Sequence, residues 1–211
     1  MSGRERRKSE LRYCEWLRAG LCCILVRAAS PPTFPPMTTP DLRFPVGRFA
    51  PTTTDERSRA EAISIIAGLP AKMRAAVEGL SDAQLDTRYR PEGWTVRQVV
   101  HHVPDSHMNA FARFKLALTE DTPRIKPYAE ARWAELPDGR TGPLEPSLSI
   151  LDGLHARWTV LLRAMRAEDF ARQLEHPDNG VQSLDRMLAI YAWHSRHHLA
   201  HITELKRREG W

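Results

Sequence analysis

Seven of the nine histidines in this 211-residue chain fall within two short windows. Imidazole is a common ligand of zinc and other divalent ions, and two histidine-bearing helices of one bundle can hold an ion between them. The clustering therefore predicts a metal centre, provided that both windows are helical. The members are His101, His102 and His107 in the first window, and His194, His197, His198 and His201 in the second.

Helical periodicity selects two histidines of the second window. At about 100° per residue an apolar stripe follows residues 184–205, with His198 near its centre and His194 close to its edge. His201 lies further round, and His197 is mostly off the stripe. Residues four apart share a helix face, so His194 and His198 point inward together and can reach one ion. A lone buried histidine is more often a hydrogen-bonded core residue, but this pairing favours a metal.

The third ligand stays open in the first window. Four valines and Phe114 define the apolar face there. On this helical wheel His107 is the most central histidine, His102 is marginal and His101 points away. Pro104 disturbs the count of residues after it, because proline distorts a helix. Periodicity alone therefore does not choose between His102 and His107.

The two windows lie on two of four expected long helices, which predict an all-α four-helix bundle. Thr95 is expected to cap the second helix and Ser147 to open the third. Pro70 and Pro104 should kink the first and second. A short helix over 128–136 is also expected, but no strand of useful length. The long helices are predicted at residues 54–80, 96–119, 147–165 and 184–209, with a capped turn at 82–85 and a loop turn at 176–180.

Composition predicts one cytoplasmic domain after an N-terminal extension. Much of the net charge of +5 lies in the first 27 residues, so the body shows no basic stripe for nucleic acid. All three cysteines also lie there, and no apolar run approaches the roughly 20 residues of a membrane span. Residues 1–36 end in a proline-rich run, and we interpret them as disordered or as a non-native extension. The expected domain is 37–211, starting at Met37.

Several strings of residues together resemble the DinB-like superfamily, in particular its YfiT-like metal-dependent hydrolases. The likeness covers about residues 37–211, with strings in matching order and spacing. The longer strings are GWTVRQVVHH at 93–102, DSHMN at 105–109 and YAWHSRHHLAHITEL at 191–205, and the shorter ones are RFPVG at 43–47, QLDT at 84–87 and HARW at 155–158.

The resemblance implies the complete ligand set. The first metal histidine of the family lies eight positions after the tryptophan that opens the second helix, which here is His102, and the other two match His194 and His198. The resemblance also implies a homodimer and two activities. One is hydrolysis of a small molecule, and the other is transfer of a low-molecular-weight thiol, as in bacillithiol transferases. Pro104 departs from the family pattern and puts the positions of His107 and Asp105 in doubt.

A three-histidine site keeps a coordination position open, which suits catalysis. We expect one divalent ion per chain, with zinc favoured over nickel or iron, to activate a bound water. The same ion could deprotonate a thiol cofactor instead. A non-catalytic metal-binding stress-response module and a bundle dimer with a vestigial site are the competing hypotheses.

Other roles are assigned to residues near the windows. His107 and His201 are the candidate catalytic groups, although packing roles are favoured for both. Asp105, Glu204 and also Asp185 could orient a ligand imidazole. Most helical arginines are solvated and most tryptophans are core anchors. These interpretations are favoured over substrate contacts for the remaining candidates, Arg97, Arg196, Trp94 and Trp193.

Overall fold

The computed structural model describes residues 41–50 and 54–211. These residues belong to one unit that spans Thr39–Trp211. The extension predicted at 1–36, and the domain start predicted at Met37, lie outside the described residues and stay predictions.

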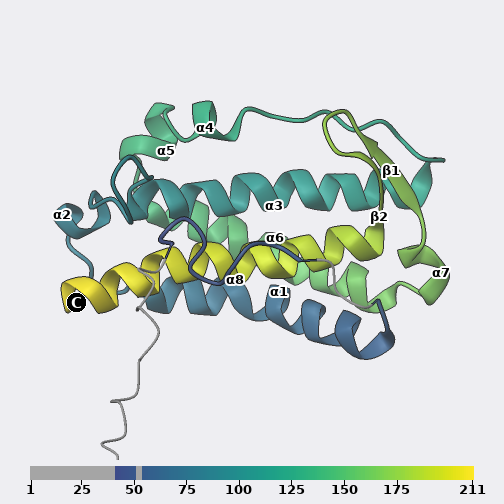
Figure 1. The fold of residues 1–211 in the computed structure, drawn as a ribbon, viewed down its shortest axis with the longest axis horizontal. Helices are drawn as coiled ribbons and strands as arrows, with labels where there is room; N and C mark the ends of the chain where they lie inside the picture. Colours follow the sequence, from purple (N-terminus) through teal and green to yellow (C-terminus); the bar gives the residue numbers. More distant parts are fainter. Residues whose placement is uncertain (1–40, 51–53) are drawn as a thin grey trace, which may run out of the picture. The chain divides into compact units, whose positions relative to one another are not determined.

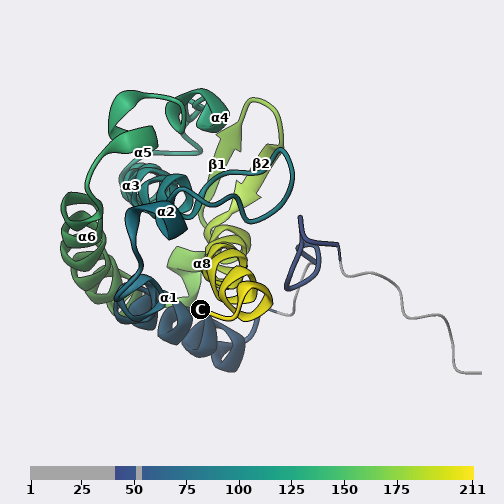
Figure 2. The same ribbon diagram turned by 90° about the vertical axis from the view of Figure 1, so that its left-hand side faces the viewer.

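Four long helices form a bundle, as the sequence predicts (Figure 1). Each long helix packs against two others, so that α1, α8, α3 and α6 follow one another around the bundle axis (Figure 2). No helix in the described ranges is long and apolar enough to cross a membrane. The helices are α1 (Glu56–Val77), α3 (Val96–Thr119), α6 (Leu144–Ala164) and α8 (Leu184–Glu209).

The connection between α3 and α6 gives the bundle its topology. Figure 1 shows α3 and α6 running in one direction and α1 and α8 in the other. The chain therefore returns along the bundle after α3, and this crossover carries the short helices α4 (Glu130–Trp133) and α5 (Pro137–Thr141). As a result the crossover lies over α3, next to the face that carries the first histidine window.

Side-chain caps fix where the helices begin. The Thr95 hydroxyl accepts a hydrogen bond from the Gln98 backbone N–H at 3.1 Å, and the Gln98 side chain accepts one from the Thr95 N–H. This reciprocal pair satisfies N–H groups that have no helical partner, and it confirms the predicted cap of α3. Ser81 caps α2 (Asp82–Leu85) in the same way.

The structure corrects two predictions about secondary structure. The third long helix begins at Leu144 rather than Ser147, whose hydroxyl instead lies 2.7 Å from His101 Nδ1. After α7 (Ala167–Phe170), a hairpin of β1 (Gln173–His176) and β2 (Gly180–Ser183) occupies residues where no strand was expected. Its strands have only four residues each, too few to show a clear alternation.

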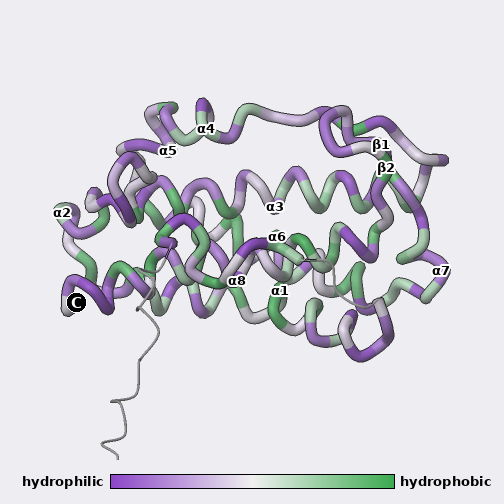
Figure 3. Tube along the Cα trace, in the orientation of Figure 1, coloured by the Kyte–Doolittle hydropathy of each residue, from purple (hydrophilic) through white to green (hydrophobic). Residues whose placement is uncertain are grey.

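Buried apolar side chains form two core clusters, one towards each end of the bundle. Figure 3 shows the hydrophobic segments recurring at short intervals along the four long helices. On α3, α6 and α8 the two clusters are separated by histidines, at His102–His107, His155 and His194–His198. The histidines therefore form one polar layer across the middle of an otherwise apolar core.

Candidate metal centre

Three histidines converge within this layer. The candidate ligand atoms of His102, His194 and His198 all lie within 4.8 Å of one another. The Nε2 atoms of His102 and His194 face each other at 3.3 Å. Two ligands at adjacent corners of a tetrahedral zinc ion, with Zn–N bonds of about 2.0–2.1 Å, are about 3.3–3.4 Å apart. The spacing therefore fits nitrogen atoms that share one ion.

Burial keeps these imidazoles neutral, which is the form that binds a metal. Burial, together with the neighbouring His197, lowers the pKa of His102 to about 4. Burial also lowers the pKa of His194 and of His198 well below the usual value, with the other histidines acting in the same direction. At neutral pH each of these imidazoles therefore has one nitrogen with a lone pair that can bind a metal.

The cluster forms part of the wall of an open pocket of about 470 Å³ between α3, α8, the crossover and the hairpin. The indole ring of Trp94 lies 4.5 Å from the His102 ring, and that of Trp193 stacks on His197 at 4.4 Å. Both tryptophans line the pocket, and Trp94 also packs against one of the core clusters. They are therefore placed to contact a bound molecule, which their interpretation as core anchors did not include.

The two histidines that the helical wheel placed away from the stripe centre are buried by another segment. Residues 41–50 lie along α8, where Trp193 Nε1 donates to the Gly47 carbonyl at 3.0 Å. The Phe44 ring lies 5.9 Å from the His197 ring, and the Arg43 carbonyl lies 3.3 Å from His201 Nε2. A helical wheel contains no information about this covering segment.

His107 lies behind the metal-ligand candidates. It is 0% exposed, and its nitrogens are hydrogen-bonded to His155 and His194. His155, on α6, was not singled out from the sequence, and its membership of the HARW string was its only signal. Neither His107 nor His201 lines the pocket, so the structure separates both from the space a substrate would occupy.

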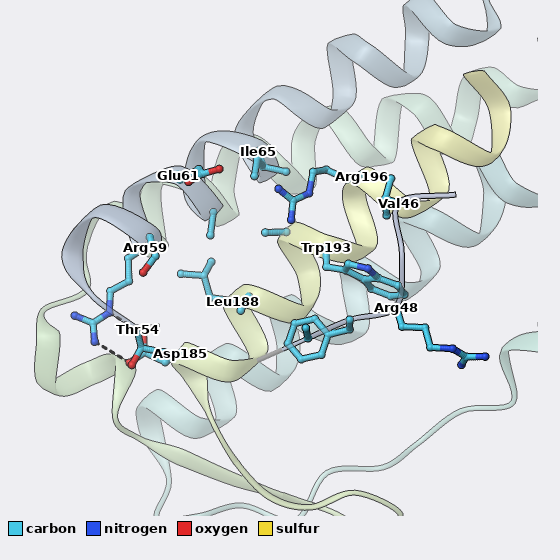
Figure 4. Close-up of a pocket in the computed structure, with 16 residues that line it drawn as sticks. Val46, Arg48, Thr54, Arg59, Glu61, Ile65, Asp185, Leu188, Trp193 and Arg196 are labelled. Carbon is cyan, nitrogen blue, oxygen red and sulfur yellow. Dashed lines mark hydrogen bonds and ion pairs between the residues drawn. The ribbon is translucent and has the colours of Figure 1, made fainter. Parts of the chain in front are cut away.

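The carboxylates proposed to orient the ligands lie elsewhere in the described structure. Glu204 pairs with Arg207 at 2.8 Å and Asp185 with Arg59 at 2.7 Å (Figure 4). Asp105 is half-buried, which raises its pKa to about 6, and its side chain makes no hydrogen bond to a histidine in the described ranges. Other histidines, rather than carboxylates, surround the candidate ligands.

The two arginines singled out from the sequence differ in environment. Arg97 is buried and its guanidinium bonds Asp86, Asp82 and the Gly142 carbonyl, which ties α3 to α2 and to the end of α5. Arg196 is exposed and lines a second pocket of about 310 Å³ between α1, α8 and the segment before α1 (Figure 4). Neither arginine lines the pocket beside the three histidines.

Comparison with known proteins agrees with this architecture. Residues 66–202 match the model of the DinB superfamily. The chain is 49% identical to "Putative metal-dependent hydrolase YfiT" of Bacillus subtilis (strain 168), over 83% of this chain and 99% of that protein. It is 51% identical to a "Putative metal-dependent hydrolase" of Bacillus anthracis, over 81% of this chain and 99% of the relative.

A solved structure of YfiT from Bacillus subtilis superimposes on this fold with a TM-score of 0.78, at 49% identity, covering 81% of this chain and 98% of that one. It is described as "a probable metal-dependent hydrolase with an unusual four-helix bundle topology". The long crossover between α3 and α6 differs from the short loops of up-down-up-down bundles. The chain belongs to the DinB superfamily and, within it, to the family of YfiT and the related proteins named as metal-dependent hydrolases.

Proposed function

We propose that this protein is a metal-dependent hydrolase that holds one divalent ion on His102, His194 and His198 and acts on a small molecule. The carrying observation is the convergence of three imidazoles, two of them buried and that of His194 half-buried, at the wall of an open pocket. Three protein ligands leave a coordination position free, whereas structural zinc sites usually have four. When bound, zinc would lower the pKa of a coordinated water to about 7 and so supply hydroxide at neutral pH.

A hydrolase also needs a group that accepts the proton of the attacking water. The sequence predicts His107 or His201 for this role, but neither lines the pocket. Besides the three candidate ligands, four carboxylate or imidazole side chains line it and can accept a proton, and they are the candidates in the proposal: Glu130, His176, Asp178 and His197.

The positively charged side chain of Arg113 also lines the pocket, and its charge indicates which class of substrate would bind there. Arg113 is only 8% exposed, and its guanidinium donates to the Lys126 carbonyl at 3.3 Å and lies within hydrogen-bonding reach of the Tyr191 hydroxyl. No carboxylate of the described residues pairs with it. An unpaired buried charge is costly. The proposal therefore assigns to the substrate an anionic group that Arg113 neutralises.

The test is a turnover assay on the full chain loaded with zinc, nickel or iron(II). Nitrophenyl esters and anilides report hydrolysis, and a low-molecular-weight thiol with a fluorogenic haloalkyl electrophile reports thiol transfer. Hydrolysis that chelation abolishes and added metal restores supports the proposal. Thiol transfer without hydrolysis supports the transferase alternative instead. Tight metal binding with neither reaction across both panels would leave a non-catalytic metal-binding module.

A further inference from the structure

The carbonyl of Ile66 in α1 has an unusual partner. In a helix this carbonyl would accept a hydrogen bond from the N–H four residues later, but that residue is Pro70, which has no N–H. The freed carbonyl lies 2.6 Å from Nδ1 of His155 on α6. Pro70 therefore leaves the Ile66 carbonyl in the bundle interior as a hydrogen-bond acceptor without a helical donor.

From this carbonyl a chain of hydrogen bonds crosses the bundle. His155 Nε2 lies 2.9 Å from His107 Nδ1, and His107 Nε2 lies 3.0 Å from His194 Nδ1. The chain ends at His194 Nε2, which faces His102 Nε2 in the candidate metal centre. It therefore links α1, α6, α3 and α8 through consecutive imidazole rings.

The carbonyl sets the direction of every bond in this chain. A neutral imidazole has one N–H donor and one acceptor nitrogen. Because the Ile66 carbonyl only accepts, His155 Nδ1 donates and its Nε2 accepts from His107 Nδ1. His107 Nε2 then accepts from His194 Nδ1. Nε2 of His194 therefore carries a lone pair instead of a proton, which is the state that binds a metal, and in the metal-free chain it can accept from His102 Nε2.

The surroundings of the two inner rings favour the neutral form. His107 and His155 are almost completely buried, and the rings of Trp158 and Tyr191 pack edge-on against His107 at 5.7 and 5.2 Å. No carboxylate in the described part of the chain hydrogen-bonds to either histidine. A charge on either ring would have no hydrogen-bonded carboxylate to balance it.

We propose that Pro70, His155 and His107 form an orienting relay that fixes the tautomer of His194 for metal binding. These are positioning residues, since none of them lines the pocket. The inference rests on the proposed function, because it assigns the relay to the same metal centre. Partners that orient ligand imidazoles typically contribute about 10–100-fold to metal affinity.

The first test is long-range ¹H–¹⁵N NMR of the metal-free, ¹⁵N-labelled full chain, which reports which nitrogen of each imidazole carries the proton. The relay predicts that His155, His107 and His194 all carry it on Nδ1. A proton on Nε2 of His194 in the metal-free protein would overturn the proposal. This measurement does not depend on metal binding or on any substitution.

The second test measures zinc affinity by competition with a chromophoric chelator. His107→Leu removes the acceptor for His194 Nδ1 and should weaken binding about 10–100-fold. His107→Gln, whose amide oxygen can accept in place of Nε2, should recover much of this loss. Pro70→Ala restores an N–H that competes for the Ile66 carbonyl and should also weaken binding. Pro104→Ala, in a buried proline outside the relay, is the matched control and should leave affinity unchanged.

The outcomes separate the relay from the proposed function. If the wild-type chain binds zinc and His107→Leu and Pro70→Ala bind it equally well, the relay is overturned while the metal site stands. An equal loss of zinc affinity in Pro70→Ala and Pro104→Ala would also overturn the relay, because the loss would then come from a change in helix geometry. If neither the wild-type chain nor any variant binds zinc although His194 has the predicted tautomer, the proposed metal site is overturned. The hydrogen-bond directions of the relay are then still supported.

Discussion

At the scale of single residues, two of the candidate ligands differ in the surroundings of Nδ1, the ring nitrogen that would not bind the metal. Nδ1 of His194 is hydrogen-bonded to His107. Nδ1 of His198 is buried and finds no hydrogen-bond partner within the described part of the chain. An imidazole whose outer nitrogen is engaged has a fixed tautomer, whereas one without a partner does not. Among the candidate ligands, His194 is therefore the one whose tautomer the protein fixes, and an ion would order His198 more than the protein does.

Arg113 gives a test of the substrate class at this scale. Arg113→Gln removes the buried cation of the pocket but retains a polar side chain. We expect inorganic phosphate to bind to the zinc-loaded wild-type chain at least about tenfold more tightly than to the variant, since a hydrogen bond to a charged group contributes about 1.5–3 kcal/mol. Isothermal titration calorimetry at fixed salt concentration measures the phosphate affinity of the wild type and of Arg113→Gln. Equal affinities would contradict the role assigned to Arg113.

Sequence reasoning predicted part of this residue set. Periodicity alone selected His194 and His198, because both lie on the apolar stripe of one regular helix. It left His102 and His107 unresolved, since both face inward and only their neighbours on other helices distinguish them. His155 could not be found in this way, because its role depends on a carbonyl 89 residues earlier in the chain. The geometry brings the predicted set together, and its role as a ligand set stays a prediction.

At the scale of elements, the histidine layer lies at matching levels on α3, α6 and α8. Matching levels require each helix to begin at a defined residue, since a shift of one residue rotates a helix face by about 100°. The caps at Thr95 and Ser183 supply these starting points for the two helices that carry candidate ligands. Such caps can be predicted from local sequence, as Thr95 was. The start of α6 was missed because no side chain caps it.

Thr95→Ala tests the contribution of the α3 cap. The substitution removes the hydroxyl that accepts from the Gln98 N–H, so the free energy of unfolding should fall by about 1 kcal/mol. Urea unfolding of the metal-free chain measures the loss, with Thr95→Ser as the matched control that retains the hydroxyl. An unchanged unfolding midpoint in Thr95→Ala would show that the cap does not stabilise α3.

At the scale of the whole molecule, the number of long helices was predictable but their connection was not. Four amphipathic segments of similar length indicate a four-helix bundle. Whether the third helix runs with or against the second depends on the path of residues 120–143, for which the sequence predicts a connector and one short helix but no direction. Here that segment crosses the bundle and helps to form the pocket, through Pro127, Tyr128 and Glu130. The pocket beside the three histidines therefore depends on the path of the crossover as well as on α3 and α8.

Burying neutral histidines makes the stability of the metal-free protein depend on pH. Burial lowers the pKa of His102 and His197 to about 4 and that of His201 to about 3, against an ordinary value of 6.5. Between pH 6.5 and about 4 the unfolded chain therefore binds more protons. Each such histidine lowers the free energy of unfolding by about 1.4 kcal/mol per pH unit over that window. Asp105, whose pKa burial raises to about 6, acts in the opposite sense and partly offsets the loss.

We therefore expect urea unfolding in the presence of a chelator to require less denaturant at pH 5 than at pH 7.5. Stability should change little between pH 7.5 and 8.5, where these histidines are neutral in both states. An unfolding midpoint that rises on acidification to pH 5 would contradict the burial of neutral histidines.

The central claim is that three histidines bind one metal ion, and metal content tests it most directly. The full chain would be reconstituted with zinc, desalted and measured by inductively coupled plasma mass spectrometry. We expect about one ion per chain in the wild type and in the control His176→Ala, and none in the triple variant His102→Ala, His194→Ala, His198→Ala. Equal metal content in the wild type and the triple variant, or none in the wild type, would contradict the account.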